Sequence, residues 1–267
     1  MSQEWLTART DAPLRFSPLD VVCAAFQLSW GRPVWTWQTL VCLLLLGLAA
    51  GLVVAHRWLS GDWEVDDFVS EILMGSYIGF LLPVWCLCFG SQLIGGAWEE
   101  GWLLWLLLRP VPRSLVYTLL LVAALPWILA LSLGGAWLLG ALAGTQAFHA
   151  SLRLAPALAL GTLAYTTLFV FLSVWLRRAT LISIAYVFVV ENVISYMPGW
   201  MSRGSISCYI RSLVISAGLT SPESNSLFSF VPVSRTAAWI TLAVITFAFA
   251  VAGGMIFSRR EYGQAAV

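Results

Sequence analysis

Side chains that commonly perform catalysis are scarce in this chain. Only two His are present, His56 and His149, which lie far apart in the sequence, and all fourteen basic residues are Arg. Because a P-loop needs a Lys on the phosphates, the chain cannot bind ATP through one. The sequence also has no HExxH pair and no Gly-x-Ser-x-Gly turn. We therefore predict a protein that is not an enzyme, needs no cofactor and acts by binding or transport.

The five cysteines have no metal-binding spacing. Cys86 and Cys88 lie within an apolar run, and no CxxC pair is present. The odd number argues against a disulfide framework, and the spacing argues against a zinc site. Thiols in apolar surroundings behave as small hydrophobic groups. The sequence therefore predicts no metal site.

Glu191 is the carboxylate with the most unusual surroundings. It lies in the otherwise apolar run 184–196 and is followed by Asn192. A carboxylate near the middle of a membrane costs roughly 2.5–3.5 kcal/mol on insertion scales, so it should face protein or water. Two interpretations stay open. Glu191 and Asn192 line or gate the outer half of a transport path, or Glu191 pairs with an Arg such as Arg203 or Arg211.

The composition sets the environment of these side chains. The chain has 267 residues, of which 60% are hydrophobic and 10% charged. Soluble domains carry about 45–50% apolar and about 25% charged residues. The chain therefore belongs in a lipid bilayer, and both a soluble domain and a disordered chain are excluded. Its net charge of +1 creates no field that would attract nucleic acid.

The predicted fold is an all-α polytopic membrane protein with six transmembrane helices, because a span needs about 20 apolar residues. The six segments are 35–55, 72–94, 115–143, 154–176, 179–197 and 236–257. They form a transmembrane domain over 35–257, preceded by a cytoplasmic N-terminus (1–34) and followed by a cytoplasmic tail (258–267). Ser17-Pro18 starts an amphipathic interfacial helix. The external insertion 198–235 contains apolar residues at helical spacing and predicts a short re-entrant or interfacial helix: Ile206, Ile210, Leu213 and Val214.

The distribution of Arg predicts the orientation. Nine Arg fall on the side of the termini and five on the other, and the tight hairpin Arg177-Arg178 belongs to the first group. By the positive-inside rule both termini are cytoplasmic. The use of Arg without Lys and the excess of Ala, Gly and Leu are typical of a GC-rich bacterial genome. We therefore expect a multi-pass protein of the bacterial inner membrane.

The segment 95–113 has a distinctive pattern. Trp98, Trp102 and Trp105 share one helical face, and Glu99 and Glu100 lie where the helix dipole favours carboxylates. Its end, Arg109-Pro-Val-Pro-Arg113, leads into the third predicted span. This is a short cytoplasmic helix with an aromatic face. An interfacial anchor is the simpler interpretation of such a helix, and it stays open.

The order Glu-Glu-Gly, a Leu-rich turn and Leu-Leu-Arg-Pro-Val-Pro-Arg resembles the signature of ABC exporter permeases of the type-2 class. That family carries it between its second and third spans, and its layout of an interfacial helix, six spans and a helical insertion before the last span is also similar. The sequence departs from the family pattern at Pro112, where Ser is more common, and at Trp102, where Thr is common.

The resemblance implies a half-transporter that pairs with a second permease chain, as a homodimer or heterodimer, and with a separate ABC ATPase subunit. The residues that would couple to this ATPase are Trp98, Glu99, Glu100, Gly101, Arg109, Pro110 and Arg113. Arg109 and Arg113 would bind acidic groups of the ATPase or Glu99 and Glu100, or else anchor on lipid phosphates. Two other functions stay open: export of a lipid-linked polysaccharide, and a membrane scaffold or assembly factor that transports nothing.

Overall fold

The computed structural model describes residues 37–61, 63–99, 112–176, 179–196, 200–220 and 232–259, and these contain helices and connecting turns but no strand. Five helices are long and apolar enough to cross a membrane. They are α2 (Trp37–Ser60), the continuous helix formed by α3 (Val65–Asp67), η2 (Phe68–Leu81) and α4 (Leu82–Glu99), then α6 (Arg113–Ala143), α7 (Thr145–Trp175) and α10 (Arg235–Arg259). The prediction of an all-helical membrane protein is confirmed at this level.

The fifth predicted span differs from the other five. Its residues form α8 (Ala179–Tyr186) and η3 (Val187–Glu191), helices of eight and five residues that end at Glu191. At 1.5 Å per residue such a helix is at most about 20 Å long, whereas the hydrocarbon core is about 30 Å thick. Of the six predicted full-length spans, five are therefore present among the described residues and the segment 179–197 is shorter than predicted.

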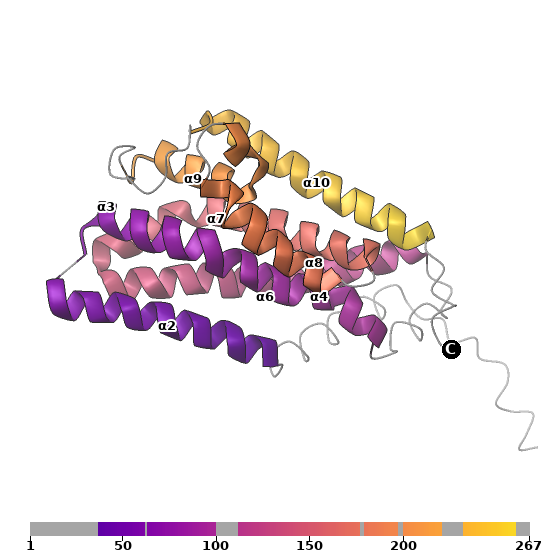
Figure 1. Ribbon diagram of the computed structural model, residues 1–267, viewed down its shortest axis with the longest axis horizontal. Helices are drawn as coiled ribbons and strands as arrows, with labels where there is room; N and C mark the ends of the chain where they lie inside the picture. Colours follow the sequence, from indigo (N-terminus) through magenta and orange to yellow (C-terminus); the bar gives the residue numbers. More distant parts are fainter. Residues whose placement is uncertain are drawn as a thin grey trace, which may run out of the picture.

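The long helices run side by side along the longest axis of the molecule (Figure 1). At one end α2 begins, α4 ends, α6 begins and α10 ends; we call this the motif end, because the segment 95–113 connects α4 to α6 there. At the other end α2 ends and α10 begins, and α9 (Ile206–Ser216) lies there. We call this the insertion end.

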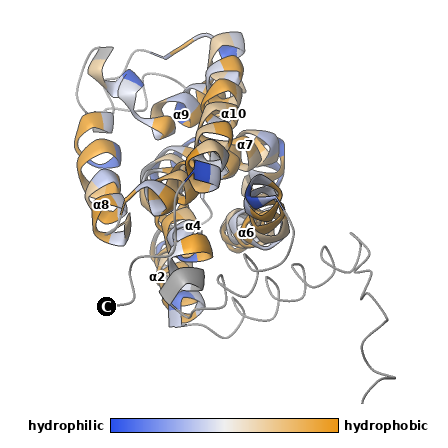
Figure 2. Cartoon of the chain, turned by 90° about the vertical axis from the view of Figure 1, so that its right-hand side faces the viewer, coloured by the Kyte–Doolittle hydropathy of each residue, from blue (hydrophilic) through white to orange (hydrophobic). Residues whose placement is uncertain are grey.

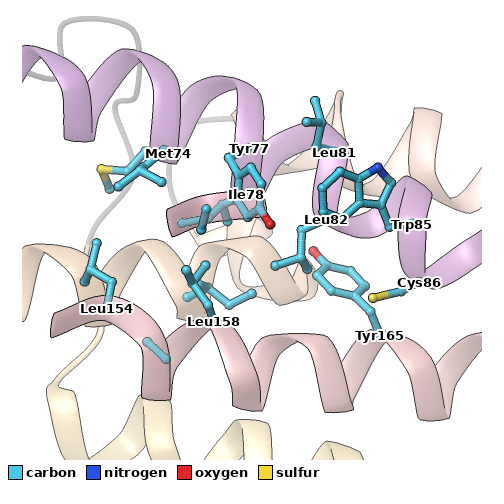
Figure 3. Packing of buried hydrophobic residues seen from close by; sticks show 14 of the residues in the cluster. Met74, Tyr77, Ile78, Leu81, Leu82, Trp85, Cys86, Leu154, Leu158 and Tyr165 are labelled. Atoms are coloured by element: carbon cyan, nitrogen blue, oxygen red, sulfur yellow. The ribbon is translucent and has the colours of Figure 1, made fainter. Parts of the chain in front are cut away.

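Helix α7 forms the centre of the bundle. In its most apolar stretch 78% of the residues are buried, against 22% in α2 and 17% in α10. Side chains of η2 and α4 pack against α7 in the main core, where Tyr77, Leu82 and Trp85 lie opposite Leu158 and Tyr165 (Figure 3). The bundle is thus built around one central helix, with α2 and α10 at its periphery.

The peripheral helices expose apolar side chains. Leu44 on α2 is 65% exposed and Phe247 on α10 is 72% exposed, and hydrophobic residues cover the helices on most sides (Figure 2). A water-soluble monomer rarely exposes apolar patches of this extent. These faces are suited to contact with lipid hydrocarbon.

Hydroxyl groups connect three helices in the middle of the bundle. The Tyr77 hydroxyl on η2 donates to the Ser132 carbonyl on α6. Thr162 on α7 donates to the Ser132 hydroxyl over 3.0 Å. Small polar residues of this kind favour close helix packing in membranes, and here they fix α6 and α7 beside η2.

Candidate functional site

Helix α9 is buried inside the protein at the insertion end. It packs between α7 and α10, and most of its side chains are buried: Ile206, Ser207, Cys208, Ile210, Arg211, Ser212, Leu213 and Val214. A short helix is thus present where one was predicted; that it is external and re-entrant or interfacial stays a prediction. Gly161 of α7 makes the close approach possible, because a Cβ at that position would overlap the side chain of Ile210, whose Cγ1 would lie at 2.9 Å.

The carboxylate of Glu191 holds the start of α9. Its Oε1 accepts hydrogen bonds from the Tyr186 hydroxyl and the Ile206 amide, both over 3.2 Å. Its Oε2 accepts from the Ser205 hydroxyl at 2.6 Å and from the Ser207 amide at 3.3 Å. Glu191 is fully buried. A carboxylate 14 to 16 residues earlier in the chain thus caps the helix.

A relay of serine hydroxyls connects this cap to a buried Arg. The hydroxyl oxygens of Ser205 and Ser207 lie 2.7 Å apart, and the Ser207 hydroxyl lies 2.9 Å from that of Ser195. Ser195 accepts a hydrogen bond of 2.9 Å from Nη1 of Arg211. Arg211 is as completely buried as Glu191. The site therefore joins a buried carboxylate and a buried guanidinium through three hydroxyl groups.

The acceptor capacity of the Glu191 carboxylate is saturated. An ionised carboxylate offers about four lone-pair positions, and four donors occupy them here. The first amides of a helix have no partner within the helix, and negative charge is favoured at that end. This geometry supports a positioning role, in which Glu191 fixes α9 relative to η3. A direct role in binding a transported molecule would require this network to open.

The contacts of Glu191 and Asn192 bear on the two interpretations that the sequence left open. The carboxylate reaches Arg211 through serines, and Arg203 is exposed on η5 (Trp200–Gly204). The side chain of Asn192 donates to the Val187 carbonyl over 3.0 Å, which satisfies the end of η3. Asn192 thus caps its own helix, and its predicted role in a transport path stays a prediction, as does that of Glu191.

Sequence reasoning missed the residues that complete the site: Tyr186, Ser195, Ser205 and Ser207. One signal was available. Ser205 directly precedes an apolar helical pattern, as an N-cap residue does. Its hydroxyl, however, bonds to Glu191 and makes no side-chain cap of its own. The pairing across the insertion has no local signal, because it depends on how η3 and α9 pack.

The segment predicted to couple to an ATPase is only partly described. Glu100, Gly101, Arg109 and Pro110 lie outside the described residues, as does the predicted N-terminal interfacial helix. The backbones of Trp98 and Glu99 end α4, and Arg113 begins α6 with an exposed side chain. The structure thus places both ends of the segment at the motif end of the bundle.

The described residues contain no group of three or more His, Cys, Asp or Glu side chains that could hold a metal ion. The five long apolar helices are those of a multi-pass membrane protein. No protein-family model matches the chain, and no curated protein matches it either.

Proposed function

We propose that the chain is the membrane-spanning permease subunit of an ATP-driven ABC exporter. Two permease chains, identical or different, would enclose the path, and a separate ATPase subunit would bind to each on the cytoplasmic side. The chain itself hydrolyses no ATP in this proposal. Both termini face the cytoplasm, and the membrane is the bacterial inner membrane.

One observation carries the proposal: α4 ends and α6 begins, on either side of the segment 95–113, at the end of the bundle opposite the buried helix α9. The segment joins α4 to α6 at the motif end, where α2 begins and α10 ends (Figure 1). The excess of Arg makes this the expected cytoplasmic side. A permease needs this separation, because nucleotide binds on one side of the membrane and release occurs on the other.

In this proposal α9 forms part of the outer closure of the path. Its buried cap keeps it in one position while the path is closed to the outside. ATP binding would favour a second arrangement of the paired chains, in which the outer side opens. Cargo specificity would depend on the surfaces that the two chains then expose.

The test is purification of the tagged chain from its native membrane in mild detergent, with mass spectrometry of the proteins that accompany it. We expect a stoichiometric ATPase subunit whose ATP hydrolysis depends on the permease. Recovery of the chain alone, or with partners that are not ATPases, would refute the proposal and favour a membrane scaffold. As a control, the same tag on an unrelated multi-pass protein should recover no ATPase.

A further inference from the structure

Tyr117 lies at the centre of a second core cluster at the motif end. It is 1% exposed, and its ring packs against that of Phe257 on α10, with centroids 5.9 Å apart. The cluster also contains Ile94, near the end of α4, and Val174, near the end of α7. Tyr117 is four residues after Arg113, about one helical turn. Both flanks of the segment 95–113 are therefore anchored where α10 ends.

The contact between Tyr117 and α10 depends on a glycine. A Cβ on Gly253 would overlap the Tyr117 hydroxyl and would lie 2.9 Å from Cζ of the ring. On the neighbouring Gly254 a Cβ would meet the ring at an ordinary distance of 3.4 Å. The Tyr117 ring thus fills the position that a side chain on residue 253 would occupy.

The Tyr117 hydroxyl is buried at this contact and has no hydrogen-bond partner among the described residues. Burying a hydroxyl without a partner destabilises the conformation that contains it. A Phe would fill the same space without that cost. A buried group without a partner in a native structure calls for an explanation, and one explanation is a contact that changes during function.

At its other end α10 is attached to α9. The amide of Val233, just before α10 begins, donates to the Ser212 hydroxyl of α9 over 3.2 Å. Ala238 and Leu242 of α10 are fully buried in the main core. The 25 residues of α10 therefore form one continuous helix, about 37 Å long, that connects the Tyr117 cluster to the capped helix.

We propose that Tyr117 and Gly253 form the joint through which movement of the segment 95–113 reaches α10 and then α9. This proposal rests on the permease function proposed above. Tyr117 acts as a positioning residue. In the described arrangement its ring occupies the Gly253 surface, and in the arrangement favoured by ATP the ring shifts and its hydroxyl gains a partner.

The experiment uses the permease purified with its own ATPase and compares hydrogen exchange with and without ATP plus orthovanadate. In the wild type we expect nucleotide to change amide exchange both near Tyr117 and in α9. In Gly253→Ala the change near residue 117 should remain, while the change in α9 should fall at least threefold. Gly254→Ala is the matched control and should respond as the wild type does. If nucleotide changes α9 exchange in Gly253→Ala as much as in the wild type, the proposed role of Tyr117 and Gly253 as a joint is refuted.

A second variant covers the case in which Gly253→Ala does not assemble. Tyr117→Phe removes only the unpartnered hydroxyl, so the Tm should rise by about 2 °C or more and the nucleotide response in α9 should fall at least twofold. An unchanged Tm with a full response would overturn the proposal. If the wild-type complex itself shows no response to nucleotide, the permease function fails and the joint fails with it. A wild-type response that both variants retain refutes the joint alone.

Discussion

Replacing Glu191 by Gln would test whether the carboxylate positions α9. The two side chains have nearly the same shape, but Gln has one acceptor oxygen and one amide donor. In the wild type each carboxylate oxygen accepts one backbone N–H, from Ile206 on Oε1 and from Ser207 on Oε2. Whichever way the Gln amide points, one of these N–H groups faces another donor. The Tyr186 and Ser205 hydroxyls can rotate to accept, whereas the backbone amides cannot.

The expected loss of stability follows from these contacts. A buried N–H without a partner costs about 1–3 kcal/mol. Loss of the charge at the helix start costs about 0.3–1 kcal/mol, and up to about 2 kcal/mol at partly buried sites. Together these give a decrease of about 1.3–5 kcal/mol in the free energy of unfolding. For a chain of this size 1 kcal/mol corresponds to about 2–4 °C, so the Tm should fall by roughly 3–20 °C.

The assay is thermal unfolding of the purified chain in detergent, combined with hydrogen exchange of the α9 amides. Glu71→Gln is the matched control, because Glu71 is an exposed carboxylate in the first turn of η2. Exposed substitutions of this kind change stability by about 0.5 kcal/mol or less. Exchange of α9 should accelerate in Glu191→Gln alone. If both variants lower the Tm equally, or if Glu191→Gln leaves the Tm and α9 exchange unchanged, the carboxylate does not hold α9 in place.

Three further predictions concern other parts of the chain. Gly161→Ala should lower the free energy of unfolding by about 1–3 kcal/mol through overpacking against Ile210, and thermal unfolding should show a lower Tm. Gly134→Ala, which has open space around it, should leave the Tm unchanged; equal effects would contradict the close packing of α9 on α7. Arg211→Met should destabilise by about 1–3 kcal/mol, because the buried Ser195 hydroxyl loses the hydrogen bond from Nη1, and chemical denaturation that shows no loss would exclude this role of Arg211. The double variant Glu100→Ala, Arg113→Ala should abolish export from membrane vesicles while assembly and ATP hydrolysis remain intact. Unchanged export would refute the coupling role of the segment 95–113.

The sequence predicted the long helices well because each contains a stretch of about 20 predominantly apolar residues. The predicted bounds fail where a helix continues beyond the bilayer core. Helix α7, for example, begins at Thr145, nine residues before the predicted start at Leu154. In that first part Ala147 and Ser151 are buried while Arg153 is exposed. A search for continuous apolar residues misses this stretch, because only one face of the helix packs against the protein.

The candidate site was less predictable than the helices. The cost of burying a carboxylate identified Glu191 as unusual, and this needed only the sequence. Three of its four partners lie 14 to 16 residues further along, and the distance in sequence says nothing about which backbone amides will meet the carboxylate. The early end of the fifth predicted span also depends on these contacts between residues that are distant in sequence. A longer helix would carry the carboxylate away from the start of α9, which provides three of the four groups that donate hydrogen bonds to it.

The insertion end and the motif end of the bundle are each stabilised by a different kind of interaction. At the insertion end the contacts are directional hydrogen bonds between buried polar groups, and such bonds weaken steeply when their angles change. A small displacement of α9 would leave several polar groups without partners, so the network specifies one position. At the motif end an aromatic ring lies on a glycine surface, and apolar contact of this kind is not directional. In the proposed mechanism, movement that begins at the segment 95–113 would shift the Tyr117 contact first, and would displace α9 only once the strain exceeds what the hydrogen bonds of Glu191 can resist.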